Sequence, residues 1–238
     1  MRVYGFFNTD VGRTKLMIIS QLRRFATCTA FILAVAFSTA NAGFLYVLNG
    51  QGSTGAWAYG FHADPETGVL TPLAGSPLAA GSTGTPFFLN ESMAVDSRNR
   101  RLYVLNDGPN TLSVYAIDAA TGALTEMPYS PLQLAAANWG TVNVHPSGSP
   151  VVAGGMLSGF SGIVSSFVFA EDSVNAATGS PFSTGMATPF SGAFSRDGAY
   201  YYTGGFTVFS PYIAGFSVDA ATGVLTALPG SAFDAGGP

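Results

Sequence analysis

One phrase recurs four times along this chain at a nearly fixed interval, and this repeat limits the fold more than any other feature of the sequence. Each copy closes with a Ser-Pro or Ser-Ala pair, whose serine falls at Ser76, Ser130, Ser180 and Ser231, in steps of 54, 50 and 51 residues. A period of this length is typical of repeat architectures, in which each unit buries its apolar face only against its neighbours. The sequence therefore predicts a row of similar units rather than one continuous core.

Each copy contains short segments that are rich in β-branched and aromatic residues and are separated by Gly, Pro, Asn or Asp. Named strands A, B, C and D, these segments in the second copy are residues 90–96, 101–106, 112–118 and 123–127. Such strands, without a sustained helical period after residue 42, predict an all-β fold. Four strands in every ~50 residues predict a β-propeller of four-stranded blades. About four blades are expected, over residues 43–80, 90–132, 139–182 and 189–233.

The turn between strands C and D carries a repeated Asp-x-x-Thr-Gly motif, which begins at Asp64, Asp118 and Asp219. An Asp side chain accepts hydrogen bonds from backbone NH groups two residues on, and Gly supplies the positive φ that closes a hairpin. We therefore interpret these carboxylates as turn formers rather than catalysts. In the third copy, Glu171 and Asp172 are predicted to form the turn instead, which leaves a shortened outer strand.

The first 42 residues have the pattern of a secretory signal peptide. Arg23 and Arg24 precede the 13-residue apolar run Phe25–Phe37, and residues 40–42 read Ala-Asn-Ala. A basic flank, a short apolar run and an Ala-x-Ala site predict export and cleavage before Gly43, and therefore a secreted or periplasmic protein. The alternative is an uncleaved anchor, although a spanning helix needs about 20 apolar residues.

Without this segment the chain is acidic and contains neither Cys nor Lys. The single Cys28 and the single Lys15 lie before residue 43, and the remainder holds four Arg and twelve Asp or Glu, for a net charge of −8 (4 − 12). An acidic surface without lysines disfavours nucleic acids and anionic membranes, which need basic patches. The lack of Cys after residue 42 excludes disulfides and Cys-based metal sites from the mature chain.

The repeated motifs resemble those of a known family. They are Leu-Tyr-Val-Leu-Asn (residues 45–49 and 102–106), the Asp-x-x-Thr-Gly-x-Leu turns, the Gly-Ser-Pro linkers and Val-His-Pro-Ser-Gly (residues 144–148). They are similar to those of the seven-bladed lactonase-like propellers, which are related to YVTN-repeat proteins and include 6-phosphogluconolactonases and muconate-cyclase-like proteins. The resemblance covers essentially all of residues 43–238. It implies the fold but leaves the reaction open, because its motifs are the structural repeat itself.

The chain is shorter than the family pattern implies. It starts on a strand B and reaches residue 238 where a further strand A is expected, so it contains one three-stranded and three four-stranded blades. We interpret it as a partial member of the family: an open arc of blades, or a ring that forms only by pairing with another chain. A closed ring of four blades is the alternative. Without a strand A in the first blade, however, two sheet edges would stay open and favour self-association.

The predicted functional site lies at one mouth of the propeller channel, where the D–A and B–C loops gather, since function usually lies on such loops. The only acids that we place there are Glu91 and Asp107. The polar and aromatic residues expected around them are Asn49, Asn90, Asn106, Asn138 and Trp139. Lactone hydrolysis needs a base to activate water and a donor to stabilise the oxyanion, roles that fit an acid and an Asn amide. The alternative is that these are solvated loop residues and caps.

No cofactor is predicted, although Glu91, Asp107, Asn49 and Asn106 would offer oxygen ligands to Ca²⁺ at this mouth. The two histidines, His62 and His145, fall on different strand types, which argues against a zinc site or a Ser-His-Asp triad.

The arginines after residue 42 argue against a phosphorylated substrate. All four are expected in A–B turns, on the end of the blades opposite the mouth, where they would not meet a bound phosphate. They are Arg98, Arg100, Arg101 and Arg196.

Three functions are compatible with the sequence. The favoured one is a secreted binding or scaffold module without catalysis of its own, with a small lactone or carbohydrate as its ligand. The second is a lactone hydrolase that acts on an unphosphorylated lactone. The third is a non-functional, truncated gene product.

Overall fold

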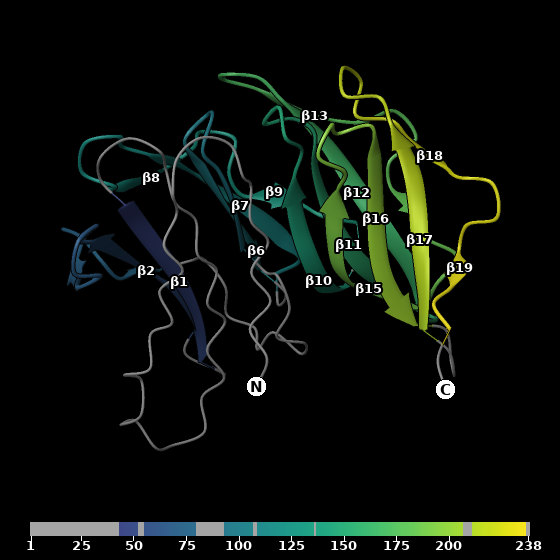
Figure 1. Cartoon of the computed structure of the whole chain (residues 1–238), viewed down its shortest axis with the longest axis horizontal. Coiled ribbons are helices and arrows are strands. Elements are labelled where there is room, and N and C mark those ends of the chain that lie inside the picture. Colours follow the sequence, from purple (N-terminus) through teal and green to yellow (C-terminus); the bar gives the residue numbers. More distant parts are fainter. Residues whose placement is uncertain are drawn as a thin grey trace.

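The computed structural model describes residues 43–51, 55–79, 93–106, 109–135, 137–206 and 211–236. Every regular element in these ranges is a β-strand, so none of them is a helix able to cross a membrane. The strands form four antiparallel sheets that follow one another along the sequence and stand side by side as the blades of a β-propeller (Figure 1). The predicted all-β fold with about four blades is therefore confirmed.

The first two blades show the arrangement that all four share: successive strands pair, and a last short strand returns to pair with strand C. The first blade shows no strand A in its described residues and consists of β1 (Gly43–Gln51), β2 (Gly55–Ala63), β3 (Leu70–Pro72) and β4 (Leu78–Ala79). The second consists of β5 (Met93–Asp96), β6 (Arg101–Asn106), β7 (Thr111–Ile117), β8 (Leu124–Glu126) and β9 (Leu132–Gln133).

The third and fourth blades repeat the five-stranded arrangement of the second. The third consists of β10 (Ala137–Val144), β11 (Val151–Leu157), β12 (Ser161–Phe169), β13 (Val174–Ala176) and β14 (Phe182–Ser183). The fourth consists of β15 (Thr188–Phe194), β16 (Tyr200–Phe206), β17 (Pro211–Val218), β18 (Leu225–Ala227) and β19 (Phe233–Asp234).

The outer strand of each blade is divided into two short pieces, which the sequence did not predict. In the second blade, β8 pairs with residues 115–117 of β7, whereas β9 pairs with residues 111 and 112. Between the two pieces, Ser130 Oγ accepts a hydrogen bond from Val114 N at 3.0 Å. The same bond joins Ser76 Oγ to Gly60 N (2.9 Å), Ser180 Oγ to Ser166 N (3.0 Å) and Ser231 Oγ to Gly215 N (3.0 Å). The serine that marks the repeat thus satisfies the strand C amide where the outer strand breaks.

The Asp-x-x-Thr-Gly turns hold their shape through the aspartate, as predicted. Asp118 Oδ1 accepts from Thr121 Oγ1 and Thr121 N, both at 2.8 Å, and from Ala120 N at 3.0 Å. These bonds, that of the Thr121 hydroxyl first, lower the pKa of Asp118. Gly122 has a φ of 70°, and a Cβ there would lie 2.5 Å from Phe44 Cδ1, because the turn packs against the first blade. The aspartates are therefore turn formers.

The third blade keeps the outer strand but shortens its turn. The chain bends at Glu171 and Asp172, as predicted, and Ala170 N donates to Ser173 O at 2.9 Å. The strand that follows, β13, has three residues, the same as β8 and β18. The predicted shortening of the outer strand is therefore wrong. The third copy has a shorter C–D turn instead, and pairing with strand C keeps β13 at three residues.

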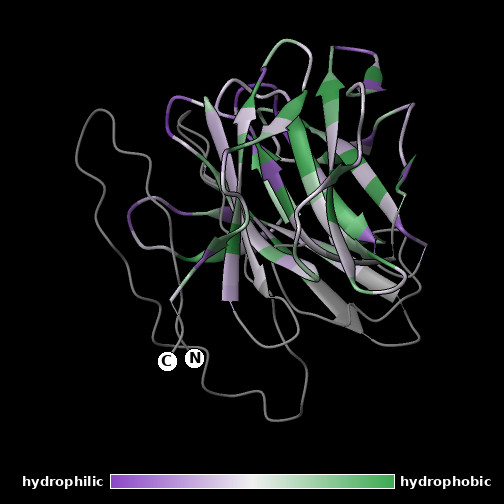
Figure 2. Cartoon of the chain, turned by 90° about the vertical axis from the view of Figure 1, so that its right-hand side faces the viewer, coloured by the Kyte–Doolittle hydropathy of each residue, from purple (hydrophilic) through white to green (hydrophobic). Residues whose placement is uncertain are grey.

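Strand alternation gives every blade two apolar faces, which we name the preceding face and the following face after the blade that each one meets. In β6, Leu102 and Val104 lie on the preceding face and pack against the first blade. Tyr103 and Leu105 lie on the following face and pack against the third. Three apolar cores therefore lie between the blades rather than within them. In Figure 2, hydrophobic residues lie mainly along the strands, and many of the turns are hydrophilic.

Candidate functional site

The predicted site lies at the end of the blades that carries the B–C and D–A connections, here named the loop end. The A–B and C–D turns lie at the opposite end, the turn end, because consecutive antiparallel strands reverse direction. Backbone bonds hold these connections together at the loop end: Leu134 N donates to Asn110 O of the B–C connection at 2.8 Å, and Gly162 N, at the start of strand C, donates to Met186 O of the D–A connection at 2.7 Å. The blade geometry thus gathers these connections as expected.

Most of the predicted site residues have no described side chain. Glu91, Asn90 and Asp107 lie outside the described residues. Asn49, Asn138 and Trp139 have a described backbone only, in β1 and β10. Asn138 and Trp139 were expected in a loop, whereas the structure extends β10 through them with two register shifts. Whether the predicted residues meet around one ligand therefore remains a prediction.

Asn106 is the predicted site residue whose side chain the structure describes. It ends β6 and is 1% exposed. Its Nδ2 donates to Ser113 Oγ at 2.8 Å and to Thr111 Oγ1 at 3.1 Å, which ties strands B and C of one blade together at the loop end. Its Oδ1 is buried without a hydrogen-bond partner. Asn106 therefore joins strands B and C through its amide nitrogen, whereas its amide oxygen has no hydrogen-bond partner.

The aspartates that begin the C–D turns, together with Asp96 and Asp197, accept hydrogen bonds within turns at the turn end. Asp197 Oδ1 accepts from Ser195 Oγ at 2.6 Å and from Ala199 N at 3.0 Å, and the serine bond is the main cause of its lowered pKa. Asp96, which is buried, accepts from Asn99 Nδ2 at 2.7 Å and from Arg98 N at 2.9 Å. These carboxylates stabilise turns and lie far along the blades from the predicted site.

Asp234 is an acid at the loop end that the sequence analysis missed. It lies on β19, opposite Tyr212 near the start of strand C, and its Oδ1 accepts from Gly236 N at 2.8 Å. Asp234 is therefore a third acid at the loop end, to which Glu91 and Asp107 were assigned. The omission follows from the divided outer strand: the predicted strand D stopped before the serine, whereas β19 carries the chain back to the loop end.

His145 serves the packing of the third blade on the fourth. It is 6% exposed, its Nδ1 accepts from Ser147 N at 3.0 Å, and its Nε2 lies 3.1 Å from Gly198 O. Its ring meets Phe194 edge-on at 5.2 Å between centroids. Burial lowers its pKa. Within the described ranges, no three His, Cys, Asp or Glu side chains gather as metal ligands.

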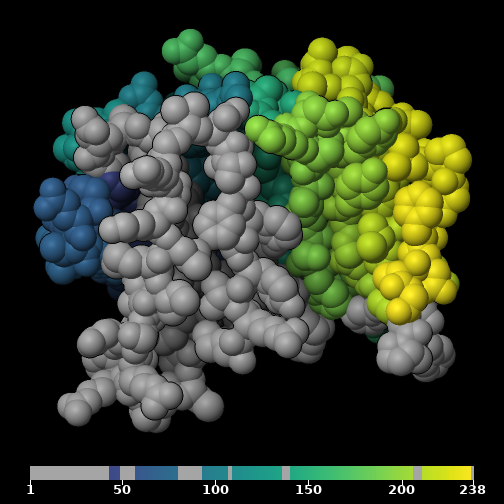
Figure 3. Space-filling view, in the orientation of Figure 1, coloured from purple at the N-terminus to yellow at the C-terminus, as the bar shows by residue number. Residues whose placement is uncertain are grey.

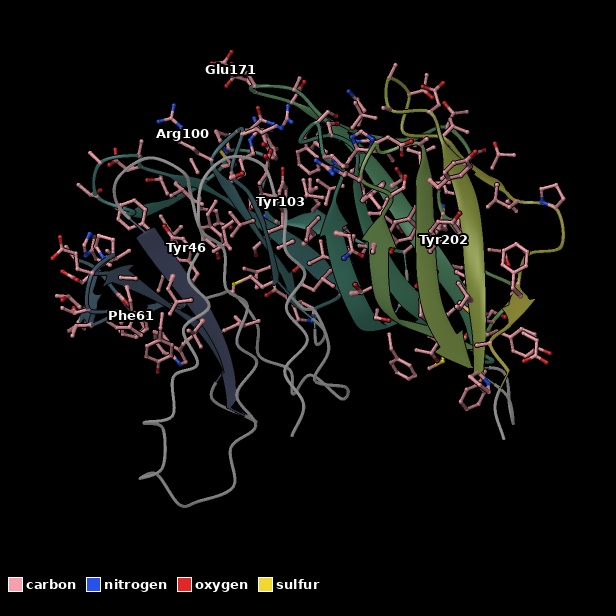
Figure 4. All side chains as sticks on the ribbon, viewed as in Figure 1. Tyr46, Phe61, Arg100, Tyr103, Glu171 and Tyr202 are labelled. Carbon is pink, nitrogen blue, oxygen red and sulfur yellow. The ribbon has the colours of Figure 1, made fainter. Side chains whose placement is uncertain are left out.

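Arg98, Arg100 and Arg196 lie in A–B turns, as expected, whereas Arg101 is the first residue of β6. Arg101 is buried, and its Nη2 donates to Ala170 O at 2.7 Å and to Glu171 O at 2.8 Å in the third blade. Arg100 and Glu171 both lie at the upper edge of the molecule in Figure 4. The Arg101 guanidinium therefore joins two blades, a role with no signal in the sequence because its partners are backbone carbonyls of another repeat.

Neither protein-family models nor curated protein sequences match this chain. Solved structures do: a proposed 6-phosphogluconolactonase of Bacteroides fragilis matches 89% of the chain at 17% identity with a TM-score of 0.64. The periplasmic gluconolactonase PpgL of Pseudomonas aeruginosa matches 86% at 14% identity, also with a TM-score of 0.64. The chain has a lactonase-like β-propeller fold. It spans 57% of the first of these propellers and 55% of the second, and identities this low extend the likeness to the fold alone.

Proposed function

We propose that this chain is a secreted lactonase-like propeller protein that binds a small lactone or carbohydrate at the loop end without catalysis of its own. The observation that supports this proposal is the buried Oδ1 of Asn106, which has no hydrogen-bond partner. A buried acceptor without a partner costs about 1–3 kcal/mol. Since Asn106 is 1% exposed, a ligand hydroxyl would satisfy it by displacing the residues that cover it at the loop end, and lactones of sugar acids and carbohydrates carry such hydroxyls.

The export part of the proposal rests on residues 1–42, whose basic flank, apolar run and Ala-Asn-Ala site have the signal-peptide pattern. Fractionation of the expressing cells should find the protein outside the cytoplasm. Amino-terminal sequencing of that fraction should begin at Gly43. A cytoplasmic protein that retains Arg23 would contradict this part.

Binding is tested by titration calorimetry of the purified protein against unphosphorylated aldonolactones and monosaccharides. For a ligand that binds, Asn106→Ala should weaken affinity about tenfold or more, equivalent to about 1.4 kcal/mol, because the acceptor is lost. Gln133→Ala is the matched control, since Gln133 also carries an amide at the loop end of this blade, where its Nε2 donates to Asn110 O at 3.0 Å. Affinity that Asn106→Ala leaves unchanged would contradict the proposal.

Lactone hydrolysis is the second candidate, favoured by the shared fold with proteins described as lactonases. In this case Glu91 or Asp107 would act as the base toward water, and an Asn amide would stabilise the oxyanion. Ring opening of unphosphorylated lactones should then fall about 100-fold or more in Glu91→Gln or Asp107→Asn. Asp234→Asn is the control, because Asp234 caps a backbone amide on the outer strand. Activity that survives both changes would exclude these bases, and a folded protein without activity would favour the binding proposal.

A further inference from the structure

Exposed apolar residues gather on the following face of the fourth blade. They are Tyr200 (41% exposed), Tyr202 (39%), Ile213 (40%) and Phe233 (37%). The register places them on one face, since Tyr202 pairs with Gly215, Gly204 pairs with Ile213, and Ile213 pairs with Phe233. This blade forms the right-hand end of the molecule in Figure 3. Four large apolar side chains on one face differ from singly scattered ones, and such patches mark interaction sites.

The same positions are covered in the second blade. Tyr103 and Leu112, which correspond to Tyr202 and Ile213, are both 0% exposed in the core against the third blade. Leu132, which corresponds to Phe233, packs against that core as well. The exposed surface of the fourth blade is therefore a copy of an interface that the chain already uses between its own blades.

The first blade exposes the matching kind of surface, a preceding face. Val47, Trp57, Tyr59 and Phe61 lie on it, opposite the face that Tyr46 presents to the second blade. Trp57 is 37% exposed and the other three are half-buried, whereas Leu45, which pairs with Phe61 on the same face, is buried. Figure 4 shows Phe61 and Tyr202 at opposite ends of the arc of blades.

An aromatic residue occupies one position of every preceding face. Phe61 corresponds to Tyr115, Phe167 and Phe216 of the later blades. These three are 2%, 9% and 2% exposed, because each packs on the following face of the blade before it. Phe61 is the member of this set whose partner blade the described chain does not supply.

The two surfaces also agree in charge. The described strand positions of the fourth blade's following face and of the first blade's preceding face include no Asp, Glu, Lys or Arg. Two uncharged surfaces bury each other without leaving an unpaired charge, which would cost several kcal/mol. A surface that met nucleic acid or anionic lipid would carry cations instead.

We propose that these two surfaces bind each other in a second copy of this chain. The first blade of one copy covers Tyr202 and Ile213 of the other, and the two-fold symmetric pair forms this contact twice. Such a pair closes a ring of about eight blades, within the range that propellers adopt. Each new contact repeats the pairing of a following face with a preceding face that already occurs three times in the chain.

The experiment measures the mass of the full exported protein by light scattering at micromolar concentration. The wild type should have twice the mass of one chain, and Tyr202→Lys or Trp57→Lys should each reduce it to one chain. Both residues are exposed in the single chain, so the variants should fold. Phe160→Lys is the control: Phe160 is 72% exposed in the β11–β12 hairpin, away from both surfaces, and should remain a dimer.

Mixing the two variants identifies which surfaces meet. An equimolar mixture of Tyr202→Lys and Trp57→Lys should form dimers more readily than either variant alone. Each mixed pair keeps one intact contact, between the fourth blade of one variant and the first blade of the other, and confines both substitutions to the second contact. A wild-type monomer would overturn the proposal and assign these surfaces to another partner, such as further blades of a longer chain. Dimers of Trp57→Lys alone would overturn it too, since the fourth blades would then be pairing with themselves.

Discussion

The second and fourth blades carry equivalent strands and turns, yet the following face of one is a core and that of the other is a surface. Tyr103 is fully buried, whereas Tyr202 at the same position is 39% exposed. The two residues pair with strand C in the same register, opposite Val114 and Gly215. Burial in this molecule is therefore a property of the neighbouring blade and not of the repeat, as expected for an architecture in which each unit contacts only its neighbours.

The largest expected effect comes from truncating the two tyrosines of this comparison. Tyr103→Ala should lower the free energy of unfolding by about 3–5 kcal/mol, the usual cost of removing a large buried aromatic side chain. Tyr202→Ala should change it by less than about 0.5 kcal/mol in the single chain, because its neighbours do not close over it. Urea unfolding of both variants, diluted until the wild type is monomeric, measures the difference. Equal losses would mean that the fourth blade is covered within one chain.

A smaller effect should separate the hydroxyl groups of Tyr46 and Tyr103, two equivalent residues on following faces. Tyr46 Oη donates to Gly122 O of the next blade at 2.6 Å, whereas Tyr103 Oη is buried without a partner. Tyr46→Phe should therefore cost about 1 kcal/mol, because it leaves a buried carbonyl unsatisfied. Tyr103→Phe should be neutral or stabilising, since it removes an unpaired polar group. Urea midpoints in the opposite order would show that the Tyr103 hydroxyl has a partner, such as the neighbouring guanidinium of Arg101.

The smallest effect concerns the pH dependence of stability. It arises at His145 of the third blade, whose Nε2 lies 3.1 Å from Gly198 O of the fourth blade. Burial lowers the pKa of His145 in the folded chain, so below about pH 6.5 the unfolded chain binds a proton that the folded chain does not. Its contribution is complete above that pH and is lost progressively as the pH falls toward the folded pKa.

Urea midpoints at pH 7.5 and 5.5 test this expectation, with His145→Gln as the variant that should lose the difference. The turn aspartates serve as an internal reference. Hydrogen bonds from Thr121 and Thr222 lower the pKa of Asp118 and Asp219, so their contribution disappears only below about pH 4. The same midpoint shift in the wild type and in His145→Gln would exclude His145 as its source.

The elements that sequence reasoning located are those with local causes. Strand B of the second blade was predicted at its observed bounds, Arg101–Asn106, because β-branched and aromatic residues fill it between turn residues. The aspartate turns were predicted because each carboxylate bonds to amides two and three residues away. The candidate site was harder to predict. Asp234 was missed because its position depends on how the outer strand resumes after Ser231, which is a matter of pairing with strand C.

The sequence by itself determined the unit: its strands, its aspartate turns and the repeated serine that satisfies strand C, all set by contacts within about fifty residues. The tertiary structure decided what the units do to one another. In it, Tyr103 is buried and Tyr202 is exposed. His145 packs against Gly198, and Arg101 donates hydrogen bonds to carbonyls of the next blade. The reason is physical: local hydrogen bonds can be read from spacing, whereas burial of a blade face depends on which other face lies against it.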